Sequence, residues 1–260
     1  MRFEWVPCQD DCRGWISATG VITSETPKAF EDFAHDRDIA GATMVLDSSG
    51  GSVNDAIVLG RKWRGLGLLT TVGATIDRPR SATGSAAVIP DASCESMCVF
   101  LLLSGKVRYV PPGARVRVHQ IWMGDRANDA RAATYSAQDL MIVERDIGRL
   151  AKYTFDMGGS GDLLELALSI PPWEALHQLS PAELRRTNIV TTDAVADVLP
   201  PRMIEPETPV AAGGSKPIQD RFSSSVVNIV APPSVIKATK TAEAAPPVSG
   251  AATPGQAQLR

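Results

Sequence analysis

The feature of this sequence that most constrains its fold is a strand–turn–helix–strand pattern. Thr43–Asp47 is a short apolar run of the kind that forms a buried parallel strand. The glycine-containing turn Ser48–Ser52 follows it, then Val53–Gly65 has the apolar spacing of an amphipathic helix, and Leu68–Val72 is a second strand. Such a unit makes a right-handed crossover in a parallel sheet, so the pattern predicts an α/β domain.

The other elements alternate in the same way. A hydroxyl cap at Thr26 followed by Pro27 opens a helix. Residues 76–93, rich in Ala, Ser, Arg and Pro, predict a long loop, and such loops inside compact domains are often functional. Strands are expected at Trp15–Ile22, Val107–Val110 and Arg115–Gln120, and helices at Thr26–Phe33, Met97–Ser104 and 127–157, with two further helices after them.

Composition divides the chain into three parts. Residues 1–14 are interpreted as an N-terminal extension, and 15–205 as the α/β domain. Hydrophobic residues make up 44% of the sequence and charged residues 21%, which is ordinary for a globular protein. From residue 206 to 260, Ala, Pro, Val, Ser, Thr and Gly dominate without a helical or strand period. Such a segment cannot bury enough apolar area to offset its chain entropy, so we expect a disordered tail.

Charge and hydropathy exclude several classes of partner. A net charge of −3 argues against binding to nucleic acid or to an anionic membrane surface. No apolar run reaches the ~18 residues of a transmembrane helix. No metal-ligand cluster and no phosphate-binding loop stands out, so we expect no cofactor and no metal. The start at Met1 lacks the apolar core of a signal peptide, which leaves a cytoplasmic location or a true start further upstream.

Four cysteines form two pairs with the same spacing, Cys8/Cys12 and Cys94/Cys98. The polar, turn-like surroundings of the first pair favour a small disulfide loop in an oxidising compartment, or two free thiols. A zinc site is the less favoured interpretation, because His35 alone lies near and the spacing repeats no zinc-finger pattern.

Three features carry chemistry. Ser96 stands where a loop passes into a buried helix, which exposes Oγ and aims the helix N–H groups at developing negative charge. His119 ends a strand and is a candidate base, because a serine hydroxyl needs an imidazole to attack at neutral pH. Gly50 and Gly51 permit positive φ, so their turn can direct an N–H group into a site. The alternatives are a plain helix cap at Ser96 and a structural role for His119.

The order of these motifs resembles the proteolytic subunit of the Clp protease family. The resemblance rests on the segments 46–53, 95–97 and 112–120, with a long helix after them and then Leu179–Leu184, and it spans about residues 16–195. It implies a Clp/crotonase-like fold of parallel β-sheet turns flanked by helices. It also implies a homo-oligomer and a polypeptide substrate that lies as an added strand beside the glycine turn.

The resemblance implies a role for each site residue. Ser96 would be the nucleophile, His119 the general base, and the N–H groups of Gly51 and Met97 the oxyanion hole. Gly50 and Ser52 would bind the substrate.

The sequence departs from the family pattern in three places. Where the acidic third residue of the triad belongs, a few positions before Leu179, Glu174 is the nearest carboxylate and His177 the nearest polar alternative. Glu95 replaces the small residue before the nucleophile, where its charge could disturb the site or bind a basic group. The stretch 76–93 is longer than in the family.

The extra N-terminal segment and the flanking cysteines are similar to a divergent branch of Clp-protease-like proteins of the bacterial periplasm. That would place the protein in the periplasm if a signal peptide is missing upstream.

The leading hypothesis for the function is a serine peptidase or related acyl hydrolase. A peptide-binding scaffold without activity and a crotonase-like acyl-CoA enzyme are the alternatives. The missing acid and Glu95 favour the scaffold, whereas the serine–histidine pair argues against both.

Overall fold

The computed structural model describes residues 1–7, 13–76, 86–123 and 134–199. The chain divides into two compact units, Met1–Thr208 and Pro209–Arg260, and only the first contains described residues. The expected tail 206–260 and the Cys8/Cys12 pair lie outside the described residues. None of the helices within the described ranges is long and apolar enough to cross a membrane.

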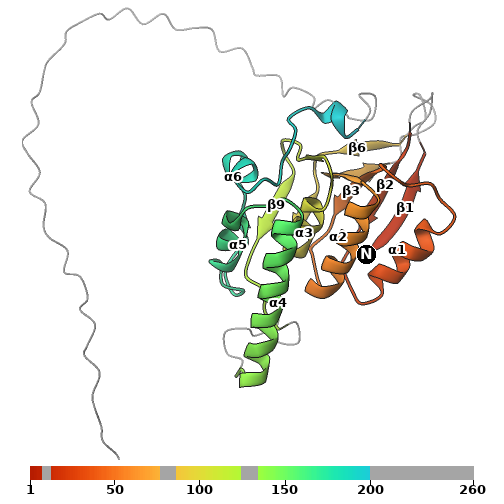
Figure 1. Cartoon of the computed structure of the whole chain (residues 1–260). Helices are drawn as coiled ribbons and strands as arrows, with labels where there is room; N and C mark the ends of the chain where they lie inside the picture. Colours follow the sequence, from red (N-terminus) through yellow and green to blue (C-terminus); the bar gives the residue numbers. More distant parts are fainter. Residues whose placement is uncertain (8–12, 77–85, 124–133, 200–260) are drawn as a thin grey trace, which may run out of the picture. The chain divides into compact units, whose positions relative to one another are not determined.

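The first unit is a mixed α/β structure (Figure 1). Its strands are β1 Arg2–Val6, β2 Trp15–Thr19, β3 Thr43–Asp47, β4 Leu69–Val72, β5 Ala74–Ile76, β6 Ala87–Ile89, β7 Ser93–Glu95, β8 Arg108–Tyr109, β9 Arg115–Val118 and β10 His177–Gln178. Its helices are α1 Thr26–Ala34, α2 Val53–Gly65, α3 Met97–Leu103, α4 Ala137–Asp156, α5 Gly161–Leu168, α6 Pro181–Arg186 and the short 3-10 helix Val195–Asp197.

The main sheet has the strand order β1-β2-β3-β4-β8. From β2 to β8 the strands are parallel, as the crossover pattern predicts, and α2 connects β3 to β4. β1 pairs antiparallel with β2, with Arg2 opposite Thr19. The first residues of the chain therefore form an edge strand of the sheet.

Alternation of side chains along the strands builds a core on each face of the main sheet. In β3, Met44 and Leu46 belong to the large core cluster, whereas Val45 belongs to a smaller cluster with Trp15 and Val88. Figure 1 shows α1 and α2 in front of the strands, where they cover the larger core. Both faces of β3 are thus buried, which explains why its sequence is a continuous apolar run.

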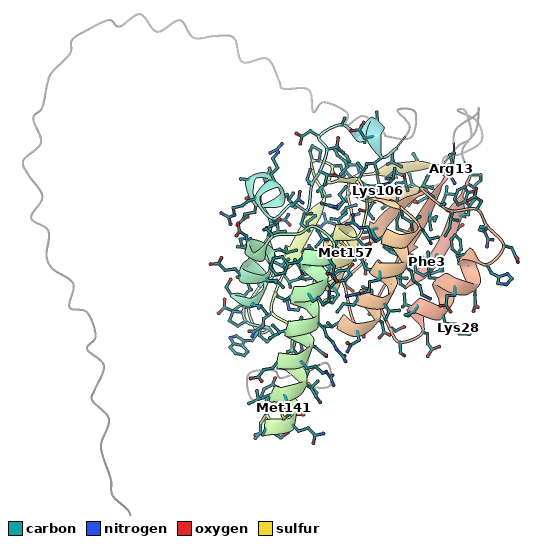
Figure 2. The ribbon with its side chains drawn as sticks, viewed as in Figure 1. Phe3, Arg13, Lys28, Lys106, Met141 and Met157 are labelled. Atoms are coloured by element: carbon teal, nitrogen blue, oxygen red, sulfur yellow. A yellow bond between two sulfur atoms is a disulfide. The ribbon has the colours of Figure 1, made fainter. Side chains whose placement is uncertain are left out.

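An aromatic group ties the N-terminal strand to the helices. Phe3, Phe30, Phe33 and Trp63 pack with ring centroids 5.2 to 6.4 Å apart, and Figure 2 labels Phe3 among them. The N-cap of helix α1 is Glu25, one residue before the expected cap Thr26, and the Thr26 side chain accepts a hydrogen bond from the Thr23 N–H at 2.9 Å.

A second sheet with the order β10-β9-β7 positions the candidate catalytic residues. β7 and β9 are parallel, and β10 runs antiparallel to β9. The region expected as one long loop, 76–93, contains the end of β5, then β6, and the start of β7. The long helix, expected over 127–157, begins at Ala137 behind a capping box.

Candidate active site

Ser96 is the single residue between strand β7 and helix α3. Its backbone has φ 54° and ψ −123°, and its side chain makes no capping hydrogen bond, so it is not a plain helix cap. A non-glycine residue in such a conformation costs about 1–3 kcal/mol and persists only where the surroundings impose it. A serine on a sharp strand-to-helix turn projects its Oγ outward, which is the geometry of a hydrolase nucleophile.

Backbone hydrogen bonds from both sides hold this turn. The Glu95 N–H donates to the Ser48 carbonyl at 2.9 Å, and the Ser96 N–H donates to the Arg117 carbonyl at 2.8 Å. The Val99 N–H donates to the Ser96 carbonyl at 3.0 Å and so starts the helix. Ser96 is therefore fixed between the segment that follows β3 and the end of β9.

The glycine turn between β3 and α2 lies directly against Ser96. Gly50 has φ 88°, and a Cβ added there would lie 2.6 Å from the Glu95 carbonyl oxygen and 2.8 Å from the Ser96 Cβ. Gly51 has φ 137°, and a Cβ there would lie 2.1 Å from the Ile22 carbonyl oxygen. Only glycine fits this contact, because each position combines a left-handed backbone with close approach.

Two backbone N–H groups near Ser96 are available to a ligand. Met97 is the first residue of α3, where no carbonyl lies one helical turn behind it to accept its N–H. Neither Met97 N–H nor Gly51 N–H donates to an acceptor within the described ranges. Two free donors beside a nucleophile are the elements of an oxyanion hole.

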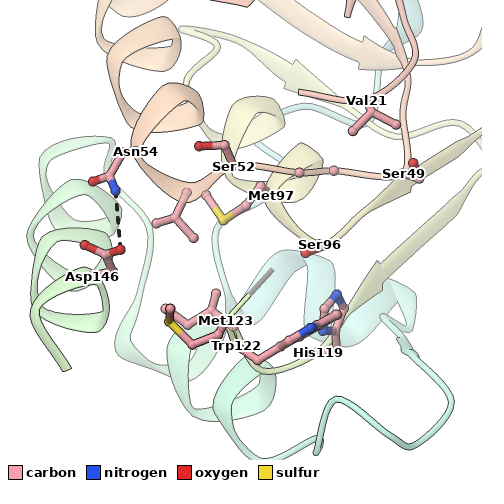
Figure 3. Close-up of a pocket in the computed structure, with 14 residues that line it drawn as sticks. Val21, Ser49, Ser52, Asn54, Ser96, Met97, His119, Trp122, Met123 and Asp146 are labelled. Atoms are coloured by element: carbon pink, nitrogen blue, oxygen red, sulfur yellow. Dashed lines mark hydrogen bonds between the residues drawn. The ribbon is translucent and has the colours of Figure 1, made fainter. Parts of the chain in front are cut away.

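These groups line one open cleft with a volume of about 560 Å³ (Figure 3). The cleft contains Ser96, Met97, His119 and residues 49–52 of the glycine turn, which include the predicted substrate-binding residues Gly50 and Ser52. Its other lining residues are Val21, Val53, Asn54, Ile121, Trp122, Met123 and Asp146.

His119 follows β9 and is half-buried in the same cleft, and Figure 3 shows its ring next to Ser96. Its Nδ1 lies 2.8 Å from the Gln120 carbonyl oxygen. A carbonyl only accepts, so Nδ1 carries the hydrogen, and in the neutral ring Nε2 is left with its lone pair. The ring also packs on Trp122, with centroids 4.5 Å apart. No hydrogen bond joins His119 to Ser96 in the described structure, as is common in enzymes without bound substrate.

Burial sets the charge of His119. Desolvation lowers the imidazole pKa below its ordinary 6.5, while the hydrogen bond to Gln120 and the Glu95 carboxylate act in the opposite direction. The lowered pKa keeps the ring neutral at pH 7, which is the form a general base needs. Glu95 itself pairs with Arg117 at 2.6 Å, so its charge is partly balanced.

The carboxylate that was expected to orient His119 is not joined to it. Glu174 is exposed, and within the described residues no hydrogen bond or ion pair connects it to His119. Nδ1, the atom that such an acid would contact, is instead bonded to the Gln120 carbonyl. His177 is bonded to Glu183 at 3.1 Å and takes no part in the cleft.

Sequence reasoning missed two features of the site. The Gln120 carbonyl has no sequence signal, because every residue carries a carbonyl. A disulfide joins Cys94 to Cys98 across Ser96, and the equal spacing of the two residues on either side of the serine is a signal that could have indicated it. Among the described residues, no group of three His, Cys, Asp or Glu side chains is placed to hold a metal ion.

Comparison with known proteins gives a similarity in structure alone. No family model matches the chain, and no curated protein matches it. Solved structures do match, among them the catalytic domain of the ClpP protease from Plasmodium falciparum, with a TM-score of 0.41 and 14% sequence identity over 67% of this chain and 80% of that one. So low a similarity indicates no function, and the functional assignment rests on the site geometry.

Proposed function

We propose that this chain is a serine hydrolase, and specifically a peptidase, with Ser96 as nucleophile and His119 as general base. Ser96 Oγ attacks the acyl carbon of the substrate and passes its proton to Nε2 of His119. The acyl oxygen becomes negatively charged and accepts hydrogen bonds from the Gly51 and Met97 N–H groups. The imidazolium then returns the proton to the leaving amine, and a water molecule releases the acyl group by the reverse steps.

The observation that carries this proposal is the backbone of Ser96. A left-handed φ at a serine is costly, and a purely structural turn would use glycine there, as the neighbouring turn does at Gly50 and Gly51. Retaining a serine in that conformation, beside a neutral imidazole, favours catalysis over a peptide-binding scaffold. An acyl-CoA enzyme of the crotonase type would use the N–H pair but has no need of Ser96 and His119.

The Gln120 carbonyl takes over part of the role of the missing acid. It fixes the tautomer and the orientation of the imidazole, which are the main functions of the aspartate in a triad. A neutral carbonyl stabilises an imidazolium less than a carboxylate does. We therefore expect slower turnover than in a hydrolase whose triad contains a carboxylate.

A Clp-like fold and self-association are part of the same proposal. Helix α4 supports self-association through its exposed apolar side chains: Leu140 is 53% exposed and Met141 69%. Figure 2 labels Met141 on α4 at the end far from Met157. Size-exclusion chromatography with light scattering of wild type and Met141→Glu tests this, and a monomeric wild type would contradict it.

A fluorophosphonate probe tests the activity. Wild type is expected to label, and Ser96→Ala and His119→Ala are expected to lose labelling while keeping the wild-type circular dichroism spectrum. Equal labelling of all three proteins would place the reactive group elsewhere. A folded wild type that does not label would contradict the hydrolase and favour the scaffold.

A further inference from the structure

The disulfide Cys94–Cys98 encloses Ser96 symmetrically. Cys94 lies two residues before the serine and Cys98 two residues after it, and their Cα atoms are 5.1 Å apart. Both cysteines are fully buried. The bond therefore joins the strand that enters the turn to the helix that leaves it.

A strand-to-helix turn of this kind brings those two positions together. In the hydrolase motif Gly-x-Ser-x-Gly the same two positions are glycines, next to a serine in a strained conformation. Here cysteines occupy both positions, and a covalent bond links them. The bond limits how far the two ends of the turn can separate.

The two sides of the turn are held unequally without the disulfide. On the entering side, Cys94 pairs with Val116 of β9 and forms a bridge to Ser48, so this residue is held by β9 and by the segment that follows β3. On the leaving side, the Val99 N–H bonds to the carbonyl of Ser96 itself, and α3 is held against the sheets by the burial of its side chains. The disulfide adds a covalent cross-link, beside the main chain through Ser96, from the start of α3 to the second sheet.

Loss of that link would act on two parts of the site at once. If the start of α3 shifts, Ser96 can relax from φ 54° to an ordinary negative φ, which redirects its Oγ. The same shift moves the Met97 N–H, since this residue follows Ser96 directly. Catalysis depends on both, because nucleophile and oxyanion donor must meet the same acyl group.

We propose that the Cys94–Cys98 disulfide is a positioning element that holds Ser96 and the Met97 N–H in their reactive geometry, so that full reactivity requires the oxidised form. This inference rests on the proposed hydrolase function. Reduction by a dithiol supplies two electrons and two protons: the S–S bond breaks, each cysteine gains a hydrogen, and the dithiol becomes a cyclic disulfide.

Labelling kinetics test the positioning role. Cys94→Ala/Cys98→Ala is compared with wild type and with Cys8→Ala/Cys12→Ala, the matched control that removes the other cysteine pair. We expect the first-order rate of phosphonylation to fall by about 10- to 100-fold in the Cys94/Cys98 variant, with unchanged half-saturating probe concentration and unchanged pH midpoint. A merely structural bond would leave the rate of the folded variant unchanged, and a rate within twofold of wild type would overturn the proposal.

Reduction of wild type covers the case in which the double variant fails to fold. After treatment with dithiothreitol, alkylation and mass spectrometry give the fraction reduced at Cys94 and Cys98. Labelling is expected to fall in proportion to that fraction and to return on reoxidation. Full labelling of the reduced protein would overturn the proposal.

A crystal structure of the Cys94→Ala/Cys98→Ala protein, or of the reduced protein, separates this inference from the proposed function. Ser96 is expected to adopt a negative φ there. If it keeps the left-handed backbone, the positioning role is wrong even where wild type labels. If wild type does not label, the hydrolase proposal fails. The φ of Ser96 in the reduced or Cys94→Ala/Cys98→Ala protein then still shows whether the disulfide holds this backbone conformation.

Discussion

Two strand-to-helix turns meet in the cleft, and they reach their backbone conformations differently. Between β3 and α2, Gly50 and Gly51 take positive φ values, which glycine adopts without steric cost. Between β7 and α3, Ser96 takes a positive φ at a cost, and a disulfide encloses it. In the proposed function the first turn supplies a backbone donor alone, so it needs no side chain. In the same proposal the second turn supplies both a donor and a nucleophile, which glycine cannot do.

The largest expected effect comes from forcing the two turns apart. In Gly50→Ala the new Cβ would lie 2.8 Å from the Ser96 Cβ and 2.9 Å from the Met97 nitrogen. We expect fluorophosphonate labelling to fall by ~100-fold or more, since displacements near 1 Å at a reactive centre have effects of that size. Gly67→Ala is the matched control, because Gly67 also has a positive φ (66°) but no atom within 4 Å of an added Cβ. A similar loss of labelling in both variants would contradict contact between the turns as the cause.

The second expected effect is on the pH dependence of labelling. Protonated His119 cannot act as a base, so the rate should rise about tenfold per pH unit below the His119 pKa and level off above it. Because burial lowers this pKa from 6.5, the midpoint should lie below pH 6.5.

Glu95→Gln sharpens the assignment of that midpoint. The Glu95 carboxylate raises the His119 pKa, so its removal should move the midpoint to lower pH. Labelling as a function of pH measures this for both proteins. A midpoint above pH 6.5, or one that Glu95→Gln moves upward, would contradict His119 as the titrating base.

A smaller effect is expected on stability at the second turn. Ser96→Gly removes the cost of positive φ, about 1–3 kcal/mol, but adds unfolded-chain entropy of about 0.5–1 kcal/mol. We therefore expect the free energy of unfolding to rise by about 1 kcal/mol, with labelling lost. Ser96→Ala, which keeps the strained backbone, is the control and should lose labelling without this gain. Urea unfolding measures both, and a less stable Ser96→Gly protein would argue against strain.

The smallest expected effect is at Glu174. Its side chain is exposed and not joined to His119, whose Nδ1 bonds to the Gln120 carbonyl. Glu174→Ala should therefore label within about twofold of wild type, since surface changes away from a site have little effect. A loss comparable to the ~10⁴-fold seen when a triad acid is replaced would restore Glu174 as the third residue.

The first turn could be predicted from the sequence, and the second only in part. β3, the glycine turn and α2 follow from an apolar run, two glycines and a helical period, all of which are local signals. The sequence signal for the start of α3 is also local. The strain at Ser96 is not a local signal, because the Ser48 and Arg117 carbonyls, which accept hydrogen bonds from the Glu95 and Ser96 N–H groups, are distant in sequence.

The other differences between the sequence predictions and the structure also come from contacts between residues that are distant in sequence, or from backbone groups. Residues Arg2–Val6 were interpreted as part of an extension, because an edge strand of alternating polarity depends on its partner β2. The orienting group of His119 is a main-chain carbonyl, and only the three-dimensional path after β9 reveals it. Side-chain chemistry can be inferred from residue types, whereas backbone groups are assigned to a site only by the fold.

The most direct test of the account is a crystal structure of the protein after reaction with the fluorophosphonate. We expect the phosphorus to be bonded to Ser96 Oγ, with the phosphonyl oxygen within hydrogen-bond distance of both the Gly51 and the Met97 N–H groups. That result would establish that the two turns form one active site. An adduct on another residue, or an oxygen turned away from both N–H groups, would contradict it.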